Sequence, residues 1–152
     1  MRARTRLVLL ASFGLAALLW SRPAEASVQL GLGADYWFDP EVGALQLTLA
    51  ADTYLARHAT IGARFGAVVT SDPSGTSDVG EVGVPIDLRL RIRGRRLYFD
   101  GLVGPWIFFE GDAFRIHAGL GFGLLSGSMS FGLEVGWVDP TPIAGIRLAF
   151  RL

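Results

Sequence analysis

Seven polar side chains, spread over the whole chain, could interact with one another inside a folded domain. They are three acids, two arginines, a histidine and a glutamine: Asp35, Gln46, Arg64, Asp87, His117, Glu134 and Arg147. Each is flanked in sequence by apolar residues, so we expect all seven to point away from an apolar face. Because buried charges must be paired, these residues favour a network of ion pairs.

Catalysis is the alternative chemistry for the same residues. A hydrolase would need a nucleophile beside His117, and the available hydroxyls are those of Ser126, Ser128 and Ser130, with Glu134 as the acid. A lone histidine near a carboxylate forms an ion pair more often than part of a triad. The sequence therefore predicts a protein without enzymatic activity, and it indicates no cofactor and no metal.

The segments that carry these residues alternate apolar and polar side chains with a period of two. This period predicts β-strands, because successive side chains of a strand point to opposite faces. Eight such segments occur, each about ten residues long, which is the length of a tilted strand that crosses a bilayer. They cover residues 28–38, 45–50, 60–69, 82–93, 97–109, 114–124, 129–137 and 146–152.

The two faces of the predicted strands differ in character. One face is almost purely leucine, valine, isoleucine and phenylalanine, whereas the other is glycine, alanine, serine and a few ions. The large apolar face would overfill the lumen of an eight-stranded barrel, which is just wide enough for side chains. We therefore predict an antiparallel up-and-down transmembrane barrel with lipid outside. A soluble periplasmic lipocalin-like carrier with inverted faces is the alternative.

The N-terminal segment predicts export. A basic stretch is followed by 14 apolar residues, Leu7 to Trp20, and by the small-residue site Ala24-Glu25-Ala26, which is typical of a signal peptide. We expect residues 1–26 to be the signal peptide and residues 27–152 to be one barrel domain. The domain would carry ten arginines and thirteen acids, a balance that argues against binding nucleic acid.

Export places the N-terminus in the periplasm, and an even number of strands returns the C-terminus to the same side. Outer loops are then expected at residues 39–43, 70–81, 110–113 and 139–142. Inner turns are expected at residues 51–59, 94–96 and 125–128. The outer loops hold eight acids and no arginine; these acids suit turns and could also bind calcium, although no spacing matches a known calcium loop.

Aromatic residues gather near the predicted strand ends, as in the girdles of membrane barrels. The outer group is Tyr36, Trp37, Phe38, Trp106, Phe108, Phe109, Phe114 and Trp137. A second group, Tyr98, Phe99, Phe122 and Phe150, lies toward the inner ends. We predict one girdle at each membrane interface.

The eight short amphipathic segments resemble the small outer-membrane barrels of the OmpA/OmpX-like kind, over residues 27–152. In that family the barrel-assembly machinery reads the final strand, and the matching residues here are Gly145, Leu148, Phe150 and Leu152. The last residue departs from the family pattern, being Leu instead of Phe or Trp. The resemblance implies a monomer in the cell outer membrane, in contact with its lipid and lipopolysaccharide, and implies no substrate.

The lumen has two interpretations. The first is a salt-bridged plug of the seven polar residues, in a barrel with a structural or surface-interaction role. The second is a narrow pore for small solutes, because nine inward glycines leave space and Arg89, Arg91 and Arg93 could line a periplasmic vestibule. A lipid-A-modifying hydrolase is a weaker alternative: its deacylase pattern has a serine two residues after the histidine, where this chain has Gly119.

Overall fold

The computed structural model describes residues 26–39, 41–71 and 80–152. The predicted signal peptide, apart from Ala26, and the middle of the predicted loop 70–81 lie outside the described residues. The strands are β1 (Ser27–Phe38), β2 (Glu41–Ala56), β3 (Ala59–Thr70), β4 (Val82–Arg93), β5 (Leu97–Phe108), β6 (Phe114–Ser126), β7 (Met129–Val138) and β8 (Thr141–Arg151). In this part of the chain, no helix is long and apolar enough to cross a membrane.

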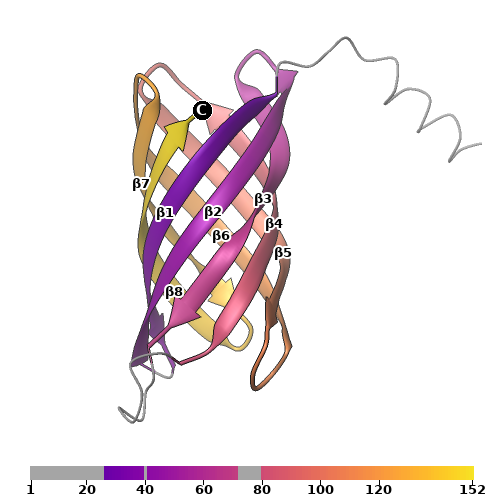
Figure 1. Cartoon of the computed structure of the whole chain (residues 1–152). Helices are drawn as coiled ribbons and strands as arrows, with labels where there is room; N and C mark the ends of the chain where they lie inside the picture. Colours follow the sequence, from indigo (N-terminus) through magenta and orange to yellow (C-terminus); the bar gives the residue numbers. More distant parts are fainter. Residues whose placement is uncertain (1–25, 40, 72–79) are drawn as a thin grey trace, which may run out of the picture.

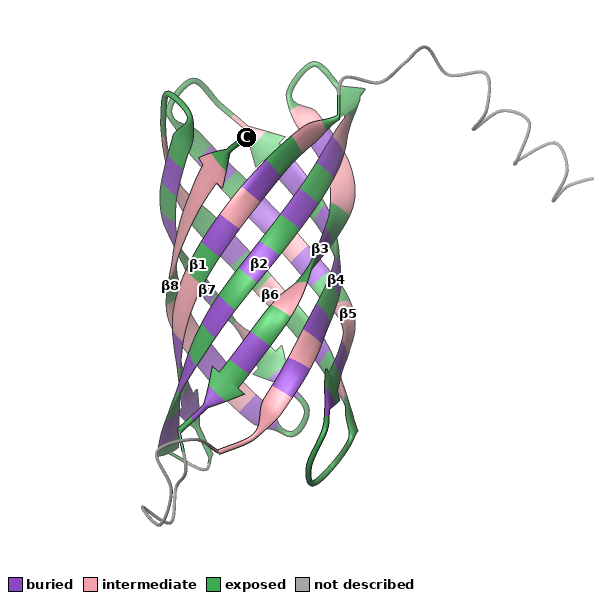
Figure 2. Ribbon diagram, viewed as in Figure 1, coloured by how far each residue is buried: buried purple, intermediate pink, exposed green. Residues whose placement is uncertain are grey.

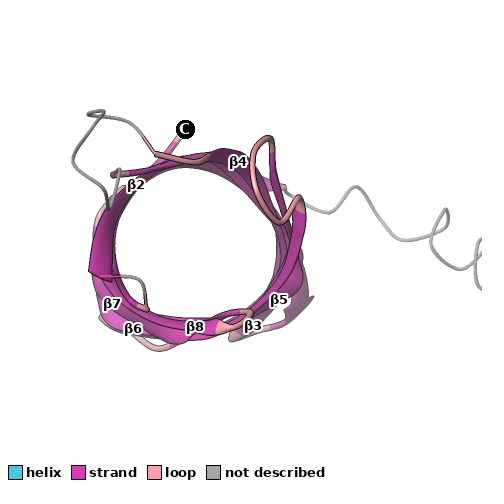
Figure 3. Cartoon of the chain, turned by 90° about the horizontal axis from the view of Figure 1, so that it is seen from below, coloured by secondary structure: helices cyan, strands magenta, loops and turns pink. Residues whose placement is uncertain are grey.

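The eight strands form one closed barrel (Figure 1). Each strand is antiparallel to its neighbour in sequence, and β1 pairs with β8 along nine residue pairs to close the ring. Viewed along the barrel axis, the strands form a closed ring (Figure 3). Closure leaves no unpaired strand edge, which a lipid environment requires. The predicted eight-stranded antiparallel barrel is confirmed.

The two ends of the barrel differ in their connections. The terminal end carries both ends of the barrel chain, where the amide of Leu152 donates to the carbonyl of Val28 over 3.0 Å. It also carries the turns β2–β3, β4–β5 and β6–β7. The loop end, opposite, carries the connections β1–β2, β3–β4, β5–β6 and β7–β8 (Figure 1).

Several predicted connections are wrong because the strands continue further than their apolar alternation. Strand β2 has 16 residues, so the inner turn predicted at 51–59 shrinks to residues 57 and 58. The turn predicted at 125–128 shrinks to Gly127 and Ser128, and Gly127 has a φ of 58°. At the loop end, β2 and β8 begin at Glu41 and Thr141, inside the predicted loops 39–43 and 139–142. Ladder pairing to the very end of each hairpin satisfies backbone groups that the longer loops would have left free.

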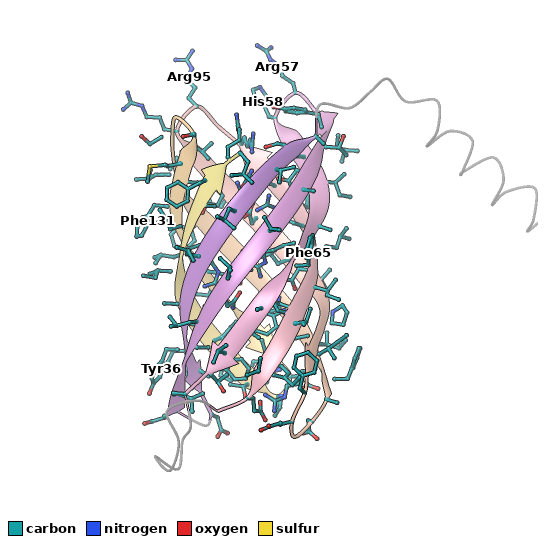
Figure 4. The ribbon with its side chains drawn as sticks, viewed as in Figure 1. Tyr36, Arg57, His58, Phe65, Arg95 and Phe131 are labelled. Carbon is teal, nitrogen blue, oxygen red and sulfur yellow. The ribbon has the colours of Figure 1, made fainter. Side chains whose placement is uncertain are left out.

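The outer surface of the barrel is an apolar band. Leu47, Leu88 and Leu120 are 51%, 54% and 66% exposed, and exposed and buried residues alternate along nearly every strand (Figure 2). The side chains of Phe65 and Phe131 point away from the strands (Figure 4). An apolar surface that encircles the whole barrel is what lipid contact requires.

The predicted outer aromatic girdle is partly wrong. Trp37, Trp106 and Phe108 are at most 1% exposed and lie inside the lumen at the loop end. Their rings contact one another, with centroid distances of 5.9 to 6.4 Å. The reason is strand parity: Trp106 and Phe108 share the inward phase of Asp100 on β5.

Candidate functional site in the barrel lumen

Arg64 on β3 forms two ion pairs inside the lumen. Its Nη2 lies 2.7 Å from Oδ2 of Asp87, its register partner on the adjacent strand β4. Its Nη1 lies 2.6 Å from Oε2 of Glu134 on β7. Strands β3 and β7 are not neighbours in the ring, so the second ion pair crosses the lumen. All three side chains are buried.

Arg147 on β8 extends this network to the other side of Glu134. Its Nη2 lies 2.9 Å from Oε1 of Glu134, and its Nη1 lies 2.5 Å from Oδ1 of Asp35 on β1. Asp35 also accepts a hydrogen bond from the side-chain amide of Gln46. Glu134 therefore receives two guanidinium groups, and each arginine faces two carboxylates.

His117 on β6 completes the group through Asp87. Its Nδ1 lies 2.7 Å from Oδ1 of Asp87, and its Nε2 lies 3.7 Å from Glu134. The indole of Trp106 donates to the same Asp87 oxygen over 3.2 Å, and its ring packs against the imidazole at a tilt of 39°. The structure thus brings all seven sequence-selected residues into one set of contacts, hereafter the central network.

A second ion network lies nearer the terminal end, and sequence reasoning missed it. Arg89 pairs with Asp52, and Arg91 forms two hydrogen bonds of 2.6 Å with Asp100. Arg91 also donates to Gln29 over 3.2 Å, and its guanidinium lies 4.1 Å from the ring centre of Tyr98. We call the four ion-paired residues Asp52, Arg89, Arg91 and Asp100, together with Gln29, the terminal network.

Strand parity is the signal that could have identified the terminal network. Arg91 and Asp100 are register partners on β4 and β5, and the period of two points both side chains inward. Asp52 has the inward parity of Gln46, but the prediction placed it in a turn. The expectation that Arg89 and Arg91 line an open vestibule is wrong, because both are buried in ion pairs.

At two of the inward glycines, neighbouring side chains of the central network occupy the space that a Cβ atom would take. A Cβ atom added at Gly33 would lie 2.8 Å from Nη1 of Arg147. One added at Gly119 would lie 2.8 Å from Nε2 of His117. These contacts are closer than van der Waals distance, so the glycines accommodate the central network. The premise of the pore interpretation, that glycines leave empty space, is wrong at these positions.

Little empty volume remains between the two networks. A cavity of about 30 Å³ is lined by residues of both, including Arg64, Arg89, Arg91 and Glu134, and it has room for about one or two water molecules. In the described ranges, no group of three or more suitable side chains is placed to hold a metal ion. The calcium alternative also involved Asp72 and Asp78, which are not among the described residues.

The four residues predicted to be read by the barrel-assembly machinery are not members of the two ion networks. Leu148 and Phe150 face outward on β8, and Leu152 is 76% exposed at the terminal end. Gly145 faces inward, where an added Cβ would lie 2.9 Å from Nη1 of Arg147. Their recognition by the assembly machinery stays a prediction.

The candidate nucleophiles of the hydrolase interpretation are far from His117. His117 pairs with Val138 in the β6–β7 ladder, whereas Ser130 pairs with Leu125 and Ser126 with Met129. Eight residues along a strand span roughly 25 Å at about 3.3 Å per residue. The described structure therefore does not bring a serine to the histidine.

Comparison with known proteins supports the fold alone. No protein-family model and no curated protein matches the chain. A designed transmembrane β-barrel is similar, with a TM-score of 0.56 and 14% identity over 87% of this chain and 98% of the other. The outer-membrane enzyme PagL has a TM-score of 0.50 and 13% identity, covering 83% and 98%.

Ail, the attachment invasion locus protein of Yersinia pestis, is also similar. It was solved with the heparin analogue sucrose octasulfate, and it has a TM-score of 0.50 and 12% identity, covering 86% of this chain and 99% of Ail. At these identities the likeness establishes architecture without establishing activity. The chain has the fold of small outer-membrane barrels, and the predicted resemblance to such barrels is confirmed at that level.

Proposed function

We propose that this protein is an integral outer-membrane barrel without enzymatic activity, closed inside by its two ion networks, with a structural or surface-interaction role. The observation that carries the proposal is the ion pair from Arg64 to Glu134, which crosses the lumen at 2.6 Å. A solute would have to separate these charges to pass. Breaking a buried pair leaves an uncompensated charge, at a cost of about 3–5 kcal/mol.

Membrane residence rests on the apolar band and the fold. A soluble carrier would bury its apolar face and expose charge, whereas this barrel exposes leucines and phenylalanines and buries its ion pairs. We place the terminal end in the periplasm, because the predicted signal peptide would deliver the N-terminus there. Membrane fractionation and a heat-modifiable shift on a gel test this residence; a protein in the soluble periplasmic fraction would favour the carrier.

Conductance in planar bilayers tests the closed lumen. We expect no steady unitary current from the wild-type protein, since the ion networks and the aromatic cluster at the loop end fill the lumen. A variant with both Arg64→Ala and Glu134→Ala removes the crossing pair and serves as the sensitised comparison. Reproducible single-channel steps from the wild-type protein would establish the pore instead.

The likeness to the outer-membrane enzyme PagL makes enzymatic activity the second function to test, and the lipid-A-modifying hydrolase considered from the sequence is the specific case. Here His117 is fully buried in the lumen against Trp106 and Asp87, whereas a lipid substrate would approach from outside. We expect the mass spectrum of lipid A to be unchanged when the protein is expressed. Loss of an acyl chain that depends on His117 would contradict this.

The likeness to Ail raises surface binding, but the charge of the loop end differs from what a sulfated ligand needs. The described loop-end acids are Asp39, Glu41, Glu81, Glu110, Asp112 and Asp139. Arg115, beside them, lies 3.0 Å from Glu81. Because this charge repels a polyanion, we expect sucrose octasulfate to bind this protein far more weakly than it binds Ail.

A further inference from the structure

The terminal end of the lumen holds a small pocket that the ion networks do not explain. It has a volume of about 10 Å³, and its polar lining is Gln29, Arg91, Arg93, Ser128, Ser130 and Arg151. We call it the terminal pocket. The pocket is lined by three guanidinium groups, those of Arg91 and Arg93 on β4 and of Arg151 on β8. Ser128 in the β6–β7 turn and Ser130 on β7 complete the polar lining.

The positive charge of the terminal pocket is not balanced. Arg91 is paired with Asp100, but within the described chain neither Arg93 nor Arg151 has a carboxylate within 4.0 Å. The Nε of Arg93 is shielded from solvent and has no acceptor. A buried donor without a partner costs about 1–3 kcal/mol, so an acceptor at this point would stabilise the structure.

Neutral donors stand beside these arginines. Ser130 is 6% exposed and Gln29 is 5% exposed, and both line the pocket. The Ser130 hydroxyl adds a directional hydrogen bond to the charge of a guanidinium fork, a combination suited to phosphate, whereas the amide of Gln29 is already bonded to Asp52 and Arg91. The lining therefore favours an oxyanion over a neutral solute.

The surroundings of the terminal pocket add to its positive field. The described turns at this end carry Arg57, Arg95 and Arg96, all exposed, and Arg57 and Arg95 extend beyond the strands (Figure 4). The acids nearest this end, Asp52 and Asp100, are buried in the terminal network. Exposed charge of one sign around a recess raises the local concentration of the opposite ion.

We propose that the terminal pocket binds a phosphate group, as free phosphate or as the headgroup phosphate of a lipid in the adjoining leaflet. The enclosed space holds about one water molecule, so the phosphate lies at the mouth. One water in the enclosed space accepts from the Nε of Arg93 and donates to a phosphate oxygen, and the guanidinium of Arg151 faces the phosphate from the other side. This site is independent of whether the lumen conducts.

Titration with inorganic phosphate tests the site on the protein purified from membranes in a maltoside detergent. At constant ionic strength, we expect saturable shifts of the backbone amide signals of Arg93, Ser128 and Ser130. Arg93→Gln should weaken binding at least tenfold. Arg95→Gln removes the same charge from a neighbouring turn outside the pocket, so it should change the affinity less than twofold. Arg151→Gln, at an exposed position that has no ion pair with any described residue, repeats the test if Arg93→Gln does not fold.

These outcomes distinguish a specific phosphate site from non-specific electrostatic attraction of phosphate to the arginines at this end. Non-saturable shifts, or equal losses in the Arg93 and Arg95 variants, would overturn the proposal. Nanodiscs with and without phosphatidylglycerol then identify the source of the phosphate. A response to inorganic phosphate that disappears in the anionic discs assigns the site to the lipid headgroup, and a response that persists assigns it to a soluble phosphate.

Discussion

At the residue scale, the barrel depends on where single charges are placed. Glu134 accepts hydrogen bonds from both Arg64 and Arg147, so it is the carboxylate that joins the two arginines of the central network. Replacement of a whole buried network by apolar groups can be neutral, whereas removal of one member leaves its partners unpaired. The central network should therefore be sensitive to single substitutions.

We expect Glu134→Ala or Arg64→Ala to lower the free energy of unfolding by about 3–5 kcal/mol, with a lower melting temperature in detergent. The cause is the buried charge that loses one of its two partners: Arg64 and Arg147 keep only Asp87 and Asp35 in the first variant, and Glu134 and Asp87 keep only Arg147 and His117 in the second. Glu110→Ala, at an exposed loop-end acid, is the control and should melt as the wild type does. Unchanged melting of both lumen variants would count against the plug.

At the element scale, strands β6 and β7 accommodate a side chain from β5. Gly123 and Gly132 are register partners, and the ring of Tyr98 lies over them: a Cβ at Gly123 would be 2.8 Å from Cε1 of Tyr98. The guanidinium of Arg91 also lies over this ring, 4.1 Å from its centroid. The two glycines thus leave room for the ring of Tyr98 on the inner face of β6 and β7. Tyr98 in turn packs against Arg91 of the terminal network.

Gly132→Ala should destabilise the barrel by about 1–3 kcal/mol, the cost typical of overpacking. The added Cβ would lie 2.5 Å from the carbonyl oxygen of Phe122 and 3.0 Å from Cζ of Tyr98. Gly101→Ala is the matched control, because a Cβ there meets no atom within 4 Å. Urea unfolding in lipid vesicles compares the two, and an equal response would argue against the packing of Tyr98.

At the scale of the whole molecule, the apolar band sets the depth of the barrel in the bilayer. Leu47 lies near the middle of β2 and is 51% exposed, whereas Leu55 lies at the terminal end of the same strand and is 65% exposed. Exposure alone does not distinguish them, but their heights along the barrel differ. In a membrane the cost of a charge depends on that height.

Leu47→Arg should cost about 2–4 kcal/mol and Leu55→Arg about 0–1 kcal/mol, the values expected for the bilayer midplane and the interface. The difference arises because the arginine at position 55 reaches the headgroups and the one at position 47 does not. Unfolding in vesicles measures both on one strand. Equal costs, or the reverse order, would show that the apolar band does not face lipid as described.

Much of this architecture was predictable from the sequence. The period of two gave the strands and both faces, because a strand side chain can point in only two directions. Asp35 and Glu134 were placed inward on this ground alone. The prediction failed where polar residues interrupt the apolar pattern and the strand was ended too early, as at Asp52, and where an aromatic residue was assigned by type instead of phase, as with Trp37.

The sequence by itself determined that this chain forms eight antiparallel strands with an apolar outer face and a charged inner face. Only the tertiary structure decided which charges meet. Arg64 pairs with Glu134 across the lumen, and Arg89 on β4 pairs with Asp52 on β2, beyond the intervening β3. These partners are not neighbours in the sheet, and their heights depend on the tilt and stagger of a closed ring. Local alternation fixes the direction of each side chain, but closure of the barrel fixes its partner.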